Sequence, residues 1–250
     1  MQTEPVIETR ELTKVYGGQA AVDGLSFTVM PGEIFGFLGP NGAGKTTTLL
    51  MLLGLTVPTS GTARVLGVDP CRDPLKVKGM IGYLPENTGF YRDLNAWESL
   101  RFIAELNGLD RKEAERQIEA ALETVGLLRD AEKRVETYSR GMRQRLGIAE
   151  VLVKQPRVAF LDEPTLGLDP DAANRLLELI RQLCRHRQMT VVLSSHLLDQ
   201  VQKLCHRVGI MIAGRLVAEG PLERLAAEKL GVGREQFTLE QIYMKYFQEA

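Results

Sequence analysis

A glycine-rich loop at residues 39–47, with the sequence Gly-Pro-Asn-Gly-Ala-Gly-Lys-Thr-Thr, restricts the fold of this chain more than any other segment. Residues 33–38 before it predict a buried strand, and residues 46–53 after it predict a helix. In such a loop the backbone N–H groups close around phosphate oxygens, Lys45 reaches the β- and γ-phosphates, and the Thr46 hydroxyl faces Mg²⁺. Strand, loop and helix in this order predict a phosphate site at a helix N-terminus.

A second segment predicts the chemistry that follows phosphate binding. The apolar run at residues 158–161 ends in Asp162 and Glu163. A pair of carboxylates directly after a buried strand can hold Mg²⁺ and activate a water molecule. The loop and the acidic pair together predict hydrolysis of a nucleoside triphosphate.

Composition narrows the class of protein. The chain has 250 residues with 44% hydrophobic content, enough to bury a full core. It contains no run of about 18 apolar residues, so we expect no membrane span. Its first residues carry neither a basic segment nor an apolar segment of the secretory type, so we expect a cytoplasmic location.

Charge and cysteine content exclude several other classes. The net charge is −1 and basic residues alternate with acidic ones, as at residues 110–116, so we expect no nucleic-acid partner. The three cysteines form no C-x-x-C pair, and their odd number argues against a disulfide framework. A metal site built from Cys184, His186, Cys205 and His206 is a weaker alternative than packed or solvated helix faces.

The order of predicted elements indicates an α/β fold. Strands are predicted at residues 6–10, 25–29, 62–65 and 81–84, followed by a helical stretch at residues 95–154. Strands at 157–161, 190–194 and 208–212 then alternate with helices at 170–187 and 196–205, and one or two short helices are predicted within 220–248. Such alternation predicts a mostly parallel sheet with helices on both faces. Since Leu38, Leu161 and Ser194 end strands, their motifs should gather along one edge.

A third motif lies in the helical stretch, at residues 138–147, Tyr-Ser-Arg-Gly-Met-Arg-Gln-Arg-Leu-Gly. On physical grounds a Ser and a Gly before an apolar helix are a helix cap that also suits a phosphate. These residues, however, resemble the signature motif of the ATP-binding cassette (ABC) family. Seven elements between Tyr16 and Asp199 follow the order of that family.

The resemblance implies a fold and a division of the chain. The fold class is α/β, the ABC ATPase fold: a P-loop NTPase core with a mostly parallel sheet, an N-terminal antiparallel β subdomain and an α-helical insertion. Residues 1–94 and 155–220 would form the core with its β subdomain. Residues 95–154 would form the insertion that carries the signature motif, and residues 221–250 a short helical tail.

The resemblance also implies roles for individual residues. Glu163 would be the general base, His196 the switch histidine at the γ-phosphate, and Lys45 a cation at the transferred phosphoryl group. Residues expected to bind ATP are Tyr16, Gly39, Asn41, Gly42, Gly44, Lys45, Thr46, Thr47, Glu86, Ser139, Gly141 and Asp169. Residues expected to bind Mg²⁺ are Thr46, Asp162 and Glu86. Tyr16 would stack on adenine, although an ordinary aromatic at a strand end is the alternative.

Two departures from the family pattern point to a branch of it. Arg140 replaces the middle glycine of the signature motif, and Glu86 replaces the usual Gln in a loop that senses Mg²⁺ and touches the membrane partner. This pair of changes resembles single-cassette subunits of exporters of the drug, antibiotic and copper-maturation type. We therefore expect a subunit that drives export.

The expected partners follow from the same resemblance. Two copies of this chain, or this chain and a related ATPase subunit, would enclose two ATP molecules head to tail. Separately encoded polytopic permease subunits would hold the chain at the cytoplasmic face of the membrane, docking near Phe90, Tyr91 and Trp97, unless these aromatics are local core. The alternative function is a soluble, non-transport ABC ATPase that remodels an assembly scaffold. A P-loop kinase or GTPase is disfavoured by Asp162 and Glu163 and by the lack of an Asn-Lys-x-Asp motif.

Overall fold

The computed structural model describes residues 4–230 and 237–249. Its strands are β1 (Ile7–Tyr16), β2 (Gln19–Val29), β3 (Ile34–Leu38), β4 (Ser60–Val65), β5 (Ile81–Leu84), β6 (Val158–Asp162), β7 (Thr190–Ser195), β8 (Arg207–Ile212) and β9 (Arg215–Gly220). Its helices are α1 (Lys45–Leu52), α2 (Pro74–Met80), α3 (Ala96–Leu106), α4 (Arg111–Thr124), α5 (Arg140–Val153), α6 (Pro170–Arg187), α7 (Leu198–Leu204), α8 (Leu222–Leu230) and α9 (Leu239–Glu249). Short 3₁₀ turns at Leu128–Asp130 and Val135–Thr137 join α4 to α5.

Two sheets form the centre of the described part of the chain. One has the strand order β5-β6-β7-β3-β8-β9, in which only the β8–β9 pair is antiparallel. The other has the order β2-β1-β4 and is antiparallel throughout. The predicted α/β class, with a mostly parallel sheet and antiparallel N-terminal strands, is confirmed.

The sequence of β3 explains how this strand joins two layers. Side chains on a strand alternate between its faces. Ile34 and Leu38 accordingly belong to one buried apolar cluster, while Phe35 and Phe37 belong to another. The two phenylalanines make edge-on ring contacts at 5.1 Å, and both contact Phe27 of β2. The central strand is therefore buried on both faces.

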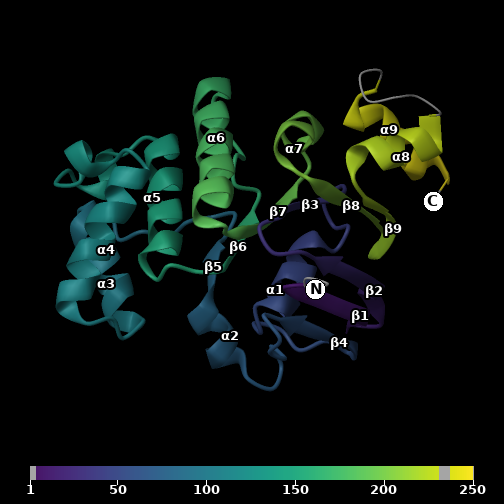
Figure 1. Cartoon of the computed structure of the whole chain (residues 1–250), viewed down its shortest axis with the longest axis horizontal. Helices are drawn as coiled ribbons and strands as arrows, with labels where there is room; N and C mark the ends of the chain where they lie inside the picture. Colours follow the sequence, from purple (N-terminus) through teal and green to yellow (C-terminus); the bar gives the residue numbers. More distant parts are fainter. Residues whose placement is uncertain (1–3, 231–236, 250) are drawn as a thin grey trace.

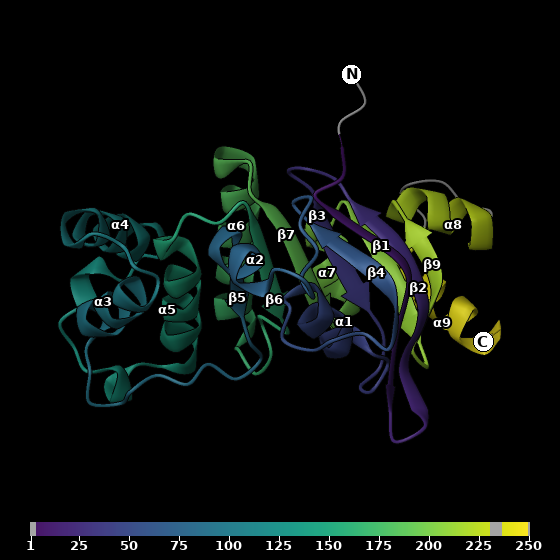
Figure 2. The ribbon, with the colours of Figure 1, turned by 90° about the horizontal axis from the view of Figure 1, so that it is seen from below.

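The predicted helical stretch consists of α3, α4 and α5, which lie together at one side of the molecule, while α8 and α9 lie at the other (Figure 1). The view in Figure 2 shows the same separation. Helix α3 begins with a capping box, in which Asn95 and Glu98 satisfy each other's backbone N–H groups. The helices bury an apolar stripe that includes Leu100, Ile118 and Leu122.

Parallel register brings the ends of the central strands to one edge. Leu38 of β3 is paired with Ser195 of β7, and Asp162 of β6 is paired with Ser194. The loop at residues 39–47 follows β3 directly and leads into α1. The predicted convergence of three strand ends is confirmed.

Three local features differ from the sequence patterns. Helix α2 and strand β9 are not predicted by them; β9 is a half-exposed strand that extends the sheet through an antiparallel hairpin with β8. Helix α7 begins at Leu198 and not at residue 196; before it, the backbone N–H groups of His196 and Leu197 donate to Glu163 Oε2 and Ser195 Oγ.

Among the described residues, no helix combines the length and the apolar character that crossing a bilayer requires.

Candidate functional site

The glycine-rich loop is shaped by close contacts with the rest of the chain. A side chain at Gly39 would overlap the carbonyl oxygen of Met211, and one at Gly44 would overlap that of Ala21. Gly44 also adopts a φ of +98°, which L residues rarely accept. The loop is thereby held against β8 and β2, and its last glycine precedes the first turn of α1.

Lys45 is buried beneath this loop. Its Nζ donates to the carbonyl oxygens of Gly39 and Pro40 at 2.8 and 3.2 Å, and lies 3.7 Å from Glu163 Oε1. Burial lowers the pKa of Lys45, and the negative charges of Glu163 and Asp162 partly oppose that effect. The loop therefore encloses a cation that faces two carboxylates.

The acidic pair continues from the end of β6. Asp162 Oδ1 accepts hydrogen bonds from Thr46 Oγ1 at 3.3 Å and from Ser194 Oγ. Only 2% of Asp162 is exposed. A hydroxyl and a carboxylate oxygen at this separation are the hard oxygen ligands that Mg²⁺ prefers, so this donor set fits the ion.

Glu163 connects three elements. Its Oε1 lies 3.0 Å from His196 Nδ1, and its Oε2 accepts the His196 backbone N–H at 3.4 Å. Its own backbone N–H donates to the Ser194 carbonyl and hydroxyl oxygens, both at 3.2 Å. Glu163 has a φ of +47°, a conformation that non-glycine residues adopt rarely and that clusters at functional sites. The conformation directs the carboxylate between Lys45 and His196.

Ser139, Gly141 and Asp169 form a second group at the start of two helices. Ser139 Oγ accepts the Met142 N–H at 3.2 Å and caps α5, and Asp169 Oδ1 accepts the Ala172 N–H at 2.8 Å and caps α6. A side chain at Gly141 would lie 3.3 Å from Ala172 Cβ. The N-termini of α5 and α6 are therefore packed together.

The remaining predicted residues are not joined to these groups by direct contacts. Tyr16 is 49% exposed at the end of β1, where Lys14 Nζ lies 4.8 Å from its ring centre. Glu86 is exposed after β5; within residues 4–230 and 237–249 no hydrogen bond or ion pair joins it to Thr46 or Asp162. Asn41, Gly42 and Thr47 lie in the glycine-rich loop and the first turn of α1.

Ser194 contacts the candidate site, although none of the sequence motifs assigns it a role. It contacts both members of the acidic pair, through Asp162 Oδ1 and the Glu163 backbone. The signal in the sequence is the position of Ser194 at the end of a predicted strand, two residues before His196. Its partners become visible only when β6 and β7 are paired.

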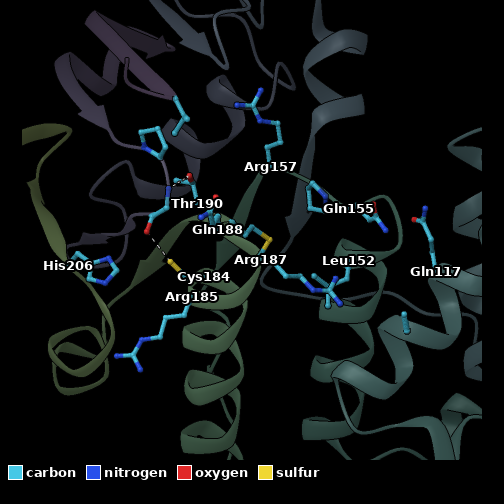
Figure 3. Close-up of a pocket in the computed structure, with 16 residues that line it drawn as sticks. Gln117, Leu152, Gln155, Arg157, Cys184, Arg185, Arg187, Gln188, Thr190 and His206 are labelled. Carbon is cyan, nitrogen blue, oxygen red and sulfur yellow. Dashed lines mark hydrogen bonds between the residues drawn. The ribbon is translucent and has the colours of Figure 1, made fainter. Parts of the chain in front are cut away.

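A sizeable cavity lies away from these groups. Its volume is about 1090 Å³, and Arg157, Cys184, Thr190 and His206 are among the lining residues. Arg157, Thr190 and His206 lie at or just before the beginnings of β6, β7 and β8, at the edge opposite the glycine-rich loop, and Cys184 lies in the last turn of α6. The guanidinium groups of Arg157 and Arg185 point in different directions (Figure 3), so the cavity does not present one charged centre.

Comparison with known proteins agrees with the motifs. The family model described as ABC transporter matches residues 22–166. The bacitracin transport ATP-binding protein BcrA of Bacillus licheniformis is 44% identical over 220 residues, which cover 88% of this chain and 71% of that protein. The linearmycin resistance ATP-binding protein LnrL of Bacillus subtilis (strain 168) is 39% identical over 215 residues, covering 86% and 69%.

A solved structure agrees with the fold. The structure described as the ATP binding subunit of an ABC transporter superposes with a TM-score of 0.85 at 29% identity, covering 97% of this chain and 99% of that chain. These relatives favour a transport role over the non-transport alternative and match the expected branch of drug and antibiotic exporters. The chain belongs to the ABC transporter family, as an ATP-hydrolysing, ATP-binding subunit related to the export-type subunits.

Proposed function

We propose that this chain powers export by hydrolysing ATP within a head-to-tail pair of ATP-binding subunits that is attached to separate membrane subunits. One observation carries the assignment of the hydrolytic residues. A chain of contacts runs from Lys45 through Glu163 to His196, beside the contact of Thr46 with Asp162. Phosphoryl transfer to water uses groups of these kinds: a cation at the phosphates, oxygen ligands for Mg²⁺, and a group that positions the water. Lys45 and His196 both contact the carboxylate of Glu163, and Thr46 and Asp162 are the oxygen ligands.

Each residue has one proposed role. Glu163 takes the proton of the attacking water, because its carboxylate accepts the backbone N–H of His196 and faces the partly exposed imidazole of the same residue. His196 orients the water and the γ-phosphate. Lys45 stabilises negative charge on the transferred group. Thr46 and Asp162 would hold Mg²⁺, with Glu86 approaching it; the ion would supply additional positive charge at the phosphates.

ATP binding is assigned to both groups of residues. Tyr16 would stack on the adenine, and the loop residues Gly39, Asn41, Gly42, Gly44 and Thr47 would surround the phosphates. Ser139 and Gly141 lie at the N-terminus of α5, and no hydrogen bond or ion pair in the described part of the chain links them to Lys45. They would instead contact the γ-phosphate held by a second subunit, with Asp169 coupling the two sites. ATP would then favour the paired state, and hydrolysis would release it.

The proposed docking site for the membrane partner is an apolar groove between the core and the helical insertion. This groove, of about 520 Å³, is lined by residues of α2, β5 and the end of α3. Leu75 and Leu106 line it and are 80% and 69% exposed. Exposed apolar patches of this kind mark interaction sites. Of the three aromatics near the expected site, Phe90 and Trp97 pack against the core, while Tyr91 is 62% exposed and contacts Phe102.

The occupant of the groove would be an apolar segment of a polytopic membrane protein. The names of the relatives support this choice, since they are transport and resistance proteins, and cbiO1 of Clostridium perfringens is described as part of the ABC transporter complex cbiONQ. Attachment through such a partner would place the chain at the cytoplasmic face of the membrane.

The experiment is purification of the tagged Glu163→Gln chain with ATP and Mg²⁺ from detergent-solubilised membranes, followed by mass spectrometry of what accompanies it. We expect a polytopic membrane protein in stoichiometric amount. Leu106→Glu should reduce its recovery about tenfold or more. Met244→Glu is the matched control, because Met244 is 44% exposed but lies on α9 at the other side of the molecule.

Two results would contradict parts of this proposal. Recovery of soluble partners alone would contradict attachment to a membrane subunit. If Leu106→Glu and Met244→Glu reduced the recovery of the membrane protein equally, the groove would not be its docking site, although attachment to a membrane subunit would still stand.

A further inference from the structure

The side chain of Arg140 lies against the loop that follows Glu163. Arg140 is the first residue of α5, immediately after the cap residue Ser139. Gly167 lies in the loop between β6 and α6. A side-chain carbon built at Gly167 would overlap Nη1 and Cζ of Arg140 and would lie 2.8 Å from Nη2. The guanidinium therefore covers the position that a side chain at residue 167 would occupy.

Gly167 provides the conditions for this contact. Its φ is +69°, in the region that glycine adopts without strain. Since glycine has no Cβ, a flat group can pack directly on its backbone. The guanidinium of Arg is planar, whereas the ammonium of Lys is compact and strongly hydrated. The contact between Arg140 and Gly167 therefore requires a planar group at residue 140 and the absence of a side chain at residue 167.

Arg140 is exposed, and its guanidinium lies on Gly167 without an ion pair. Across residues 4–230 and 237–249, no carboxylate lies within ion-pair distance of Arg140, and no hydrogen bond from its guanidinium is present. The small adjoining pocket, of about 140 Å³, is also lined by Arg145 and Arg175, which carry the same charge, and by Asp169, which caps α6. The side chain of Arg140 thus lies on Gly167 without a direct charged partner.

The loop under Arg140 joins the hydrolytic residues to the second group. Two turns order it: the Leu166 N–H donates to the Glu163 carbonyl at 3.1 Å, and the Leu168 N–H to the Thr165 carbonyl at 3.1 Å. The loop ends at Asp169. The side chain of Arg140 consequently connects the start of α5, beside Ser139, with the segment that carries Glu163.

We propose that Arg140 is a positioning residue, which packs on Gly167 and sets the placement of the Glu163–Asp169 segment relative to Ser139 within one subunit. The inference rests on the proposed function. The signature motif of this chain thereby gains a fixed contact with the loop after the general base, in place of the flexible glycine that the family usually has at residue 140.

A double-mutant cycle tests the contact in the full-length chain. Arg140→Ala should lower kcat for ATP hydrolysis about tenfold while changing KM less than about threefold, because the phosphate loop itself is untouched. Gly167→Ala should lower kcat similarly, since its Cβ displaces the guanidinium. In the Gly167→Ala variant, adding Arg140→Ala should lower kcat by less than about a further twofold, because the two substitutions remove the same contact. Additive losses would overturn the proposal.

Two further variants separate packing from charge. Arg140→Lys keeps the charge but not the plane, and we expect kcat to remain close to that of Arg140→Ala; full activity with Lys would show that charge suffices and would overturn the positioning role. Arg175→Ala is the matched control, because it removes a charge from the same pocket, while the atoms nearest to a side chain built at Gly167 all belong to Arg140. It should leave kcat within about twofold.

The outcomes are distinguishable from failure of the proposed function. Absence of ATP hydrolysis in the unsubstituted chain would contradict the function itself. Hydrolysis in that chain combined with an additive cycle would contradict only the role of Arg140. Thermal unfolding of each variant, measured in parallel, shows that the variants compared in the cycle are folded to the same extent, so that additive losses count against the contact itself.

Discussion

Glu163 and His196 are joined by two contacts: Oε1 lies 3.0 Å from Nδ1 of the imidazole, and Oε2 accepts the backbone N–H of His196 at 3.4 Å. The contacts connect the end of β6 with the residue that follows β7. Because the second contact uses the backbone, the His196 loop is oriented by Glu163 whatever the protonation state of the imidazole. The carboxylate is consequently both a chemical group and a structural one.

Replacing this carboxylate should separate binding from turnover. Glu163→Gln keeps the shape of the side chain but cannot take a proton from water, so we expect steady-state ATP hydrolysis to fall by about 100-fold or more. ATP should still bind, because Lys45 and the glycine-rich loop remain. Phosphate release and equilibrium ATP binding measure the two properties. Hydrolysis at the unsubstituted rate would remove Glu163 from its role.

The Mg²⁺ requirement should depend on Asp162. In Asp162→Asn the amide keeps the size of the group while losing its charge, so the Mg²⁺ concentration that gives half-maximal hydrolysis should rise by about tenfold or more. Titration of Mg²⁺ after removal of metal with EDTA measures the shift. Asp171→Asn is the control, because Asp171 is exposed in the first turn of α6. An unchanged Mg²⁺ requirement would contradict the assignment of Asp162.

Two glycines of the phosphate loop should differ in their tolerance of a side chain. Gly44→Ala places a Cβ against the Ala21 carbonyl at a φ of +98°, so the free energy of unfolding should fall by about 2–3 kcal/mol. Gly42→Ala is the matched control: its φ is +81°, but no atom lies within 4 Å of the added carbon. Its cost should be only about 1 kcal/mol. Urea denaturation without nucleotide distinguishes the two, and equal costs would contradict the close contact at Gly44.

Stability at alkaline pH should depend on Tyr138. Its hydroxyl donates to the Asp130 carbonyl at 2.8 Å, and burial, with the nearby Asp130 charge, raises the pKa of Tyr138 to about 12. Between the usual tyrosine pKa of about 10 and that value, the unfolded chain loses the proton and the folded chain keeps it. The contribution of Tyr138 to stability is therefore complete below pH about 10 and declines as the pH rises toward 12.

Denaturation at pH about 9 and about 11 tests this dependence. Between these values, Tyr138→Phe should lose less of its unfolding free energy than the unsubstituted chain does, because the phenyl ring does not titrate. Tyr91→Phe is the control, since Tyr91 is 62% exposed. Parallel declines in Tyr138→Phe and the unsubstituted chain would show that Tyr138 does not carry the effect.

The sequence correctly predicted the bounds of elements whose ends are determined by neighbouring residues in the chain. The helix at residues 170–187 has Asp169 as its cap and Pro170 at its first position, and its predicted bounds agree with α6. The strand at residues 81–84 agrees with β5. Both are strongly marked by local residues. By contrast, β9 was missed because its exposed, mixed-character residues become a strand only by pairing with β8.

The candidate site divides in the same way. The types of its residues were readable from the sequence, since the glycine-rich loop, the acidic pair and His196 each have local patterns. Their contacts were not, because they cross between strands: Ser194 with Asp162, Thr46 with Asp162, and His196 with Glu163. Strand order and register decide which ends become neighbours, and neither is encoded by any one segment.

By itself, the sequence determined the family, the order of elements and the identity of the groups that bind phosphate, because these follow from residue types at short spacing. Only the tertiary structure decided that Lys45 is enclosed with two carboxylates, that Gly44 is pressed against β2, and that Arg140 rests on Gly167. Each of these depends on the distance between atoms far apart in the chain, and such distances are set when the sheet closes and its core packs.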